Sequence, residues 1–246
     1  MQTGTTDGAG SYSFQFPTQA DAVFVRAKTS TDGSPSLYRI RVRMAPAGGA
    51  TPTATEPIWS RSSPNFAGNA SNTSASWNIP VDPGTSQTSH FDSAPFNVLE
   101  VMQRVQDGVR STLGVLAQVS AYTTPNEGTT GAYYGGIAGG EHFIFISGGT
   151  AGGAESSDTD FYDDGVLGHE FGHFLEAATF GTSSFGGYHS GGQRTIPSLA
   201  YGEGFGTWIG GVALGTPIYA DGGGFGPNSV VGFTSNLESD PSHFGL

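Results

Sequence analysis

The chain has 246 residues, of which 36% are hydrophobic and only 12% are charged, and none is cysteine. This composition supports a packed core and excludes disulfide bonds, thiolate metal sites and thiol nucleophiles. The formal charge of −12 arises entirely in residues 111–246, which hold thirteen acids and one base, so we expect no nucleic-acid partner.

Residues 8–44 predict short β-strands with Asp-Gly turn signals between them. Residues 37–44 alternate between apolar side chains and three arginines, Arg39, Arg41 and Arg43. This alternation is the period of a half-buried strand. We expect a small antiparallel sandwich with the arginines on a solvated sheet face, and a binding stripe is the alternative.

The segment TDGAGSYSF at residues 6–14, followed by a strand, resembles the end of the carboxypeptidase regulatory-like β-sandwich family. The resemblance implies that residues 1–50 are a partial sandwich whose first strands lie outside this chain. Residues 51–90 are rich in Pro, Ala, Thr, Ser and Asn, with little periodicity. We expect a linker or an extended surface segment there, anchored by Trp59 and Trp77.

A helix and a strand are expected next along the chain. Residues 94–118 place apolar side chains at three- and four-residue spacing, after the capping candidate Ser93. Residues 142–147 (HFIFIS) indicate a strand flanked by glycines. The glycine-rich runs contain neither a GxGxxG nor a GK[ST] motif, so no phosphate-binding loop is expected.

The strongest motif lies at residues 166–175 (VLGHEFGHFL), where His169, Glu170 and His173 form an H-E-x-x-H sequence. Side chains at i and i+4 of a helix point to one side, so both imidazoles can bind one metal ion. Glu170 lies about 100° around the helix from His169, so it can reach a water molecule bound to the metal instead of binding the metal itself. Imidazole and carboxylate ligands with one open position suit zinc. The alternative is a pair of core-facing or capping histidines with an exposed glutamate.

A catalytic zinc site needs a third protein ligand, and three downstream side chains are candidates. Glu176 lies on roughly the same helix face as the two histidines, but one turn beyond the metal position. His189 lies in the sequence Gly-Gly-Tyr-His-Ser. Glu203 lies in a segment that can form a second helix, where Gly204 and Gly206 permit close packing. Glu203 is favoured, and the other two remain alternatives.

This pattern resembles the zincin metallopeptidase family. An H-E-x-x-H motif followed thirty residues later by Glu203 resembles the gluzincin branch, whose third ligand is a glutamate on a following helix. The metzincin branch needs Gly and His where this chain has Glu176 and Thr179. A longer block within residues 158–220 reads DTDFYDD…HEFGHFLE…GGYHS…AYGEGFG. This block is similar to a group of secreted bacterial zinc metallopeptidases.

The resemblance implies zinc-dependent hydrolysis of peptide bonds. Three side chains would hold the zinc: His169, His173 and Glu203. Glu170 would take a proton from the attacking water and pass it to the leaving amine. Three side chains are candidate donors to the oxyanion: His189, Tyr188 and Tyr201. The strand at 142–147 would be the upper edge strand of the sheet, where an extended substrate can bind.

Four aspartates stand just before the H-E-x-x-H helix: Asp158, Asp160, Asp163 and Asp164. We expect them to cap the helix N-terminus and to complement its dipole. Two alternatives are calcium binding through several carboxylates and orientation of a zinc-ligating histidine.

Taken together, the sequence predicts an α+β protein in three parts. A partial antiparallel β-sandwich (1–50) and a linker (51–90) precede a zincin-like metallopeptidase domain (91–246), for which truncation at the C-terminus is an open alternative.

The expected cofactor is Zn²⁺, with Ca²⁺ as a second candidate, and the expected partner is a protein or peptide substrate. Neither a membrane span nor a signal peptide is expected in this chain, and the resemblance implies a secreted or cell-surface bacterial protein. The alternative function is a catalytically inactive metal-binding surface or adhesion module stabilised by calcium.

Overall fold

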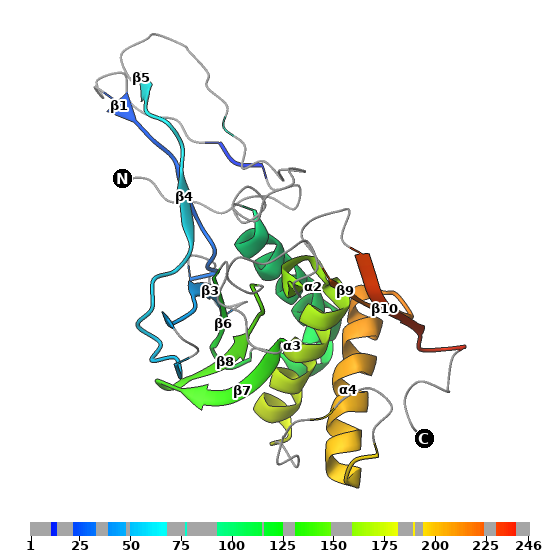
Figure 1. Ribbon diagram of the computed structural model, residues 1–246. Helices are drawn as coiled ribbons and strands as arrows, with labels where there is room; N and C mark the ends of the chain where they lie inside the picture. The colour runs from blue at the N-terminus through cyan, green and yellow to red at the C-terminus, as the bar shows by residue number, and fades with distance from the viewer. Residues whose placement is uncertain are drawn as a thin grey trace.

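The computed structural model of the protein describes residues 11–13, 22–32, 39–47, 50–67, 77, 93–114, 116–124, 131–148, 159–181, 189, 194–223 and 230–239. Within these residues, three α-helices and several sheets confirm the expected α+β class (Figure 1). No helix in this part of the chain combines the length and the apolar character needed to cross a bilayer.

A four-stranded sheet forms the centre of the fold, with its strands in the order β3, β6, β8 and β7. Their bounds are β3 (Ile40–Met44), β6 (Val119–Thr123), β8 (Glu141–Phe145) and β7 (Tyr133–Ala138). β3, β6 and β8 are parallel, whereas β7 runs antiparallel to β8 and forms one edge. The expectation that residues 142–147 form the edge strand is therefore wrong. Their apolar run reflects an inner strand covered on both faces.

β3 belongs to this sheet and not to a separate N-terminal sandwich. Residues 40–44 pair in parallel with residues 119–123 of β6. On the other side of β3, Val42 forms backbone hydrogen bonds with Thr29 and Trp59. The Trp59 indole also donates to the backbone of β6 at 3.0 Å, so this tryptophan does anchor its segment. The division at residues 50 and 90 stays a prediction, but the sheet crosses it.

The arginines of β3 do not form the solvated face that the alternation predicted. The Arg43 side chain is only 7% exposed, and it donates to Ser120 Oγ at 3.1 Å and to the Glu56 carbonyl at 2.6 Å. Glu141 of β8 pairs with Arg41 at 2.6 Å and accepts from Ser120 at 2.6 Å. Buried charges require such partners, so this network links β3, β6 and β8 side by side.

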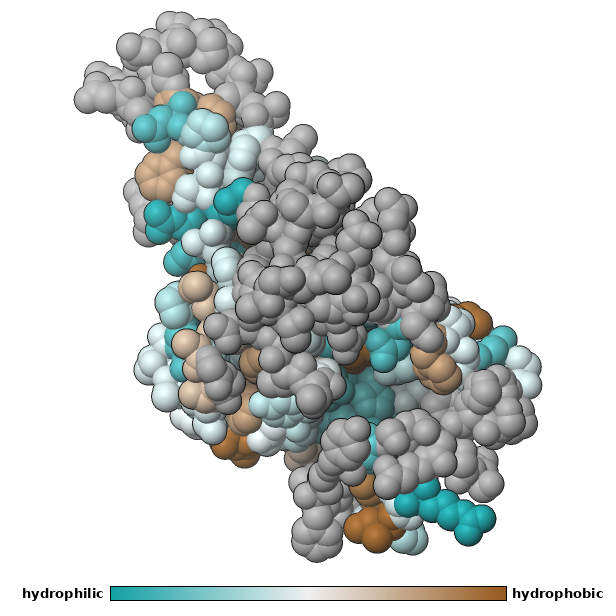
Figure 2. Space-filling view, viewed as in Figure 1, coloured by the Kyte–Doolittle hydropathy of each residue, from teal (hydrophilic) through white to brown (hydrophobic). Residues whose placement is uncertain are grey.

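Two short antiparallel ribbons extend from the sheet toward the top of the view (Figure 1). β1 (Ala22–Val23) pairs with β5 (Phe66–Ala67), and β2 (Arg26–Lys28) pairs with β4 (Ser60–Ser62). Hydrophilic and neutral colours dominate the described surface of this projection (Figure 2). The Phe24 side chain between the two ribbons is 51% exposed. The core of the fold therefore lies in the sheet and the helices beside it.

Helix α2 (Ala94–Leu113) fulfils the expected periodicity but ends earlier than residue 118. It stops at Gly114, whose φ of +70° favours glycine. Met102 and Val105 lie on its buried face, in a common core with the sheet and α3. Ser93 stands at the N-cap position without a capping hydrogen bond, and its hydroxyl lies 2.7 Å from the Tyr162 hydroxyl instead.

Helices α3 (Asp164–Thr179) and α4 (Pro197–Leu214) carry the predicted metal ligands. A short 3-10 turn (Asp160–Tyr162) precedes α3, and α3 lies between the sheet and α4 (Figure 1). Buried apolar residues dominate the sheet side of α3, with Phe171 and Phe174 fully enclosed. One face of α3 is thus anchored in the core, and the other meets α4.

Glycines set the close contact between α3 and α4. A Cβ on Gly172 would lie 2.7 Å from the Gly206 Cα, and a Cβ on Gly210 would lie 2.8 Å from the backbone carbon of Gly168. Such distances leave no room for a side chain. Gly206 therefore permits close packing as expected, whereas Gly204 does not contribute, because a Cβ there would meet nothing within 4 Å.

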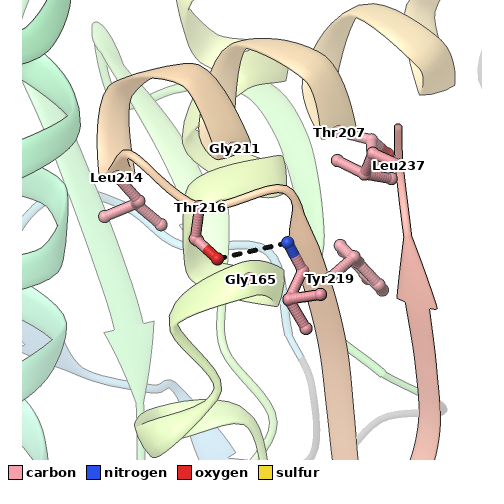
Figure 3. A pocket seen from close by; sticks show the side chains of 8 residues that line it. Gly165, Thr207, Gly211, Leu214, Thr216, Tyr219 and Leu237 are labelled. Carbon is pink, nitrogen blue, oxygen red and sulfur yellow. Dashed lines mark hydrogen bonds between the residues drawn. The ribbon is translucent and has the colours of Figure 1, made fainter. Parts of the chain in front are cut away.

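A hairpin of β9 (Ile218–Gly223) and β10 (Val230–Asn236) lies against α3 and α4. The turn before it uses Gly215 at a φ of +70°, and the Ile218 amide donates to Thr216 Oγ1 at 3.1 Å (Figure 3). A small pocket forms where the helices meet the hairpin, and Thr207 and Tyr219 are among its lining residues (Figure 3). The hairpin thereby places Tyr219 near the H-E-x-x-H residues.

Candidate metal centre

The two histidines of α3 lie side by side, as their spacing predicts. The Nε2 atoms of His169 and His173 are 3.0 Å apart, and their rings meet edge to face. Both side chains are largely buried, at 12% and 17% exposure. The motif therefore forms on one helix face, which opens toward α4.

Glu203 of α4 completes a triangle of possible ligand atoms. Its Oε2 lies 3.1 Å from the Nε2 of His169 and 3.5 Å from that of His173. Ligand atoms at about 2.0–2.1 Å from a tetrahedral zinc ion lie about 3.3 Å from one another. The three donor atoms thus fit a single ion, and these residues could hold a metal. Glu176, a candidate third ligand, is buried in α3 and is not part of this group.

The other ring nitrogen of His169 has a partner that the sequence analysis missed. His169 Nδ1 lies 2.8 Å from the hydroxyl oxygen of Thr207. Thr207 follows Glu203 by four residues on α4, so both side chains face α3. This i, i+4 relation was the available signal, because a ligand-bearing helix face also carries the residue one turn away.

The charges at the centre stabilise one another. Burial would raise the pKa of the Glu203 carboxyl, but hydrogen bonds and charge from His169 and His173 hold that pKa far below its ordinary value. Burial would likewise lower the pKa of His173, but the Glu203 hydrogen bond and the charges of Glu170, Glu203 and Glu176 raise it. The site therefore favours a negative carboxylate beside positive charge, whether that charge is a proton or a metal ion.

These pKa shifts predict that the folding stability of the metal-free protein depends on pH. A raised pKa for His173 adds stability that is complete below the unfolded value of about 6.5 and is lost as pH rises through the raised pKa. The lowered pKa of Glu203 adds stability above about pH 4.3 that is lost only in acid, so it is constant near neutrality.

We therefore expect the melting temperature of the metal-free protein to fall relative to that of His173→Gln between about pH 6 and pH 8. The difference between the two proteins isolates His173 from the other titrating groups, and calorimetry measures it. A difference that stays constant, or grows with pH, would contradict the assigned direction.

Glu170 is buried beside His169 on α3 and does not belong to the ligand triangle. Its charge contributes to raising the pKa values of His173 and Tyr219. Its carboxylate is therefore within electrostatic range of the site without being one of the three converging ligands. This placement suits a proton acceptor for a water molecule near the ion.

Of the three expected oxyanion donors, the structure brings one to the site. His189 Nε2 lies 3.1 Å from Glu203 Oε2, and its side chain is 35% exposed. Tyr201 is 59% exposed and stacks on Phe205. It precedes Glu203 by two residues, about 200° around the helix, and so points away from the triangle. This position does not favour Tyr201 as a donor, and its assignment stays a prediction, while Tyr188 lies outside the described residues.

Tyr219 is a site residue that no sequence signal indicated. Its ring meets the His169 ring edge to face, with centroids 6.1 Å apart. Burial, and the nearby charges of Asp221, Glu170, Asp160 and Asp163, raise its pKa strongly. The phenol therefore keeps its proton at neutral pH, and it encloses one side of His169.

The described aspartates before α3 have different partners, and Asp158 lies outside the described residues. Asp164 lies in the first turn of α3, where it complements the dipole, and it pairs with Arg104 at 3.2 Å. Asp163 stands at the N-cap position without a capping hydrogen bond and accepts from the Gly222 amide at 2.9 Å. Carboxylate oxygens of Asp160, Asp163 and Asp221 lie within 4.8 Å of one another, a second group that could hold a metal.

Comparisons of the chain with family models, curated proteins and solved structures found no significant match.

Proposed function

We propose that this protein is a zinc-dependent hydrolase of peptide bonds, with a zincin-like domain of the gluzincin type. The observation that carries the proposal is the triangle of His169, His173 and Glu203, with edges of 3.0, 3.1 and 3.5 Å. The H-E-x-x-H sequence supplies two ligands and an adjacent acid, as the resemblance implies. The mixed sheet with α3 packed against it supports the same assignment.

The donor set favours zinc over harder ions. Two imidazole nitrogens and one carboxylate oxygen are ligands typical of catalytic zinc, which keeps its fourth position open. Calcium and magnesium prefer sites made of oxygen alone. The Asp160, Asp163 and Asp221 group has that all-oxygen character, so calcium, if it binds, is expected there and not at the histidines.

The zinc ion and two side chains of the chain have separate roles in the proposed hydrolysis of a peptide bond. A bound zinc ion supplies a Lewis acid and lowers the pKa of water to about 7. Glu170 accepts the proton of the attacking water and delivers it to the leaving amine. His189, which is half-exposed beside Glu203, donates to the carbonyl oxygen as negative charge develops.

The resemblance also supports a secreted or cell-surface location in a bacterium. A protein or peptide is the proposed substrate, and residues 91–246 are the proposed catalytic domain. A metal-binding module without turnover would share the same ligands, so only activity distinguishes the two functions.

The test is hydrolysis of a mixture of fluorescence-quenched peptides by the purified chain. We expect cleavage that disappears on chelation and returns with about one equivalent of Zn²⁺ per chain, but not with Ca²⁺. Cleavage that survives complete removal of the metal would overturn the metal-dependent mechanism. A zinc-loaded chain that cleaves no peptide in the mixture would favour the module without turnover.

A further inference from the structure

We propose that Thr207 is a positioning residue for the metal centre, whose hydroxyl fixes the orientation and the tautomer of His169. The inference rests on the proposed function, because it concerns how the same site binds its ion. Thr207 lies on α4, so the helix that supplies Glu203 also orients a ligand on α3. The two helices would then assemble the centre through two separate contacts.

The geometry uses both nitrogens of the His169 ring. Nδ1 lies 2.8 Å from Thr207 Oγ1, while Nε2 lies 3.0 Å from His173 Nε2 and 3.1 Å from Glu203 Oε2. The α4 backbone also restrains the ring, because a Cβ on Gly206 would lie 3.4 Å from its Cε1 and Nδ1 atoms. The imidazole is thus enclosed along its edge, and its Nε2 points at the other ligands.

The chemistry of imidazole gives this arrangement its consequence. A neutral ring carries a proton on one nitrogen and a lone pair on the other, and only the lone pair binds a metal ion. A hydroxyl oxygen that accepts from Nδ1–H leaves the lone pair on Nε2, where the triangle needs it. Because the hydroxyl is neutral, it does so without adding a further negative charge to a site that already holds carboxylates.

The surroundings of Thr207 allow the hydroxyl to be tested separately from packing. Thr207 and Leu237 both line the pocket between α4 and the hairpin (Figure 3). Valine has nearly the same shape as threonine, and its additional methyl group would replace only the hydroxyl. Serine retains the hydroxyl and lacks the methyl group, so the two variants separate the two contributions.

The experiment measures the zinc dissociation constant of the full chain by competition with a chromophoric chelator. Loss of a hydrogen bond to a ligating histidine typically weakens metal binding about 10- to 100-fold. We expect that loss for Thr207→Val and at most about a threefold change for Thr207→Ser, with similar far-UV circular dichroism for both metal-free variants.

Equal zinc affinity of the valine variant and the wild type would overturn the role of Thr207 while leaving the zinc site itself in place. Equal weakening by valine and serine would also overturn it, because packing would then explain the effect. A wild-type chain that binds no zinc would overturn the proposed function together with this inference.

A second readout needs no variant. Nitrogen-15 NMR of the zinc-loaded wild type reports which nitrogen of a ligating histidine keeps its proton, and we expect Nδ1–H for His169. An Nε2–H tautomer would contradict the proposal even if the valine variant failed to fold.

Discussion

Replacing Glu170 by Gln is expected to leave zinc binding intact and to lower peptide hydrolysis about 10²- to 10⁴-fold, which is the usual contribution of a general base. Gln has the same shape but cannot accept a proton at neutral pH. Glu170 is buried outside the ligand triangle, so its loss should not release the ion. The two measurements are metal content and the rate of cleavage of a single peptide.

Glu176→Gln is the matched control for this variant. Glu176 is also a buried glutamate of α3, and its charge also raises the pKa of His173. It lies six residues further along α3 than Glu170, which is about 1.7 helical turns, too far for the same role. A general loss of negative charge would lower activity in both variants alike. If Glu170→Gln keeps more than about a tenth of the wild-type rate, its assignment as the base fails.

Replacing Gly210 by Ala is expected to destabilise the protein by about 1–3 kcal/mol and to weaken zinc binding. A Cβ at this position would lie 2.8 Å from the Gly168 carbonyl carbon and 3.1 Å from the His169 amide nitrogen. These are backbone atoms, which cannot rotate away as a side chain could. The helices must separate there, and separation draws Glu203 away from His169. Urea unfolding and chelator competition measure the two effects.

Gly204→Ala provides a control with the opposite expected sign. Gly204 lies in the same helix, but a Cβ there would meet nothing within 4 Å. Alanine should therefore stabilise α4 by about 0.5–1 kcal/mol through its higher helix propensity, with unchanged zinc affinity. Equal effects of the two substitutions would show that contact between the helices does not hold the ligands in place.

The predictable part of the site is the part that one helix determines. The spacing of His169 and His173 converts directly into a shared face, because helix geometry is local. The glycines of α3 also carried information, because they mark where another backbone approaches. Glu203 was favoured among three candidates because its segment could form a second helix with glycines for close packing, and the resemblance implied the same ligand. Helix α4 places its Oε2 3.1 Å from His169 Nε2.

The errors arose where strands or helices meet partners that are distant in sequence. The alternation in residues 37–44 predicted a strand but could not reveal its parallel pairing with β6, 79 positions further along. The same pairing buries Arg43 against Ser120, although its alternation resembled a solvated face. Side-chain alternation is identical for either kind of sheet, so only the pairing decides which face is exposed.

The oxyanion donors show the same limit within the site. The resemblance implied Tyr201 as a candidate donor, yet its side chain is 59% exposed and lies two residues from Glu203, on the opposite side of the helix. Tyr219 reaches His169 from a hairpin 50 positions away in the chain, and no local pattern marks such a contact. Thr207 could have been found by extending the helix-face argument from Glu203 by one turn.

The most direct test of the account is the zinc content of the purified 246-residue chain, measured by mass spectrometry beside His169→Ala. The account predicts about one zinc per chain in the wild type and its loss in the variant, since a site with two remaining ligands binds far more weakly. Equal zinc content in the two proteins, or no zinc in the wild type after reconstitution, would contradict a metal centre at His169, His173 and Glu203.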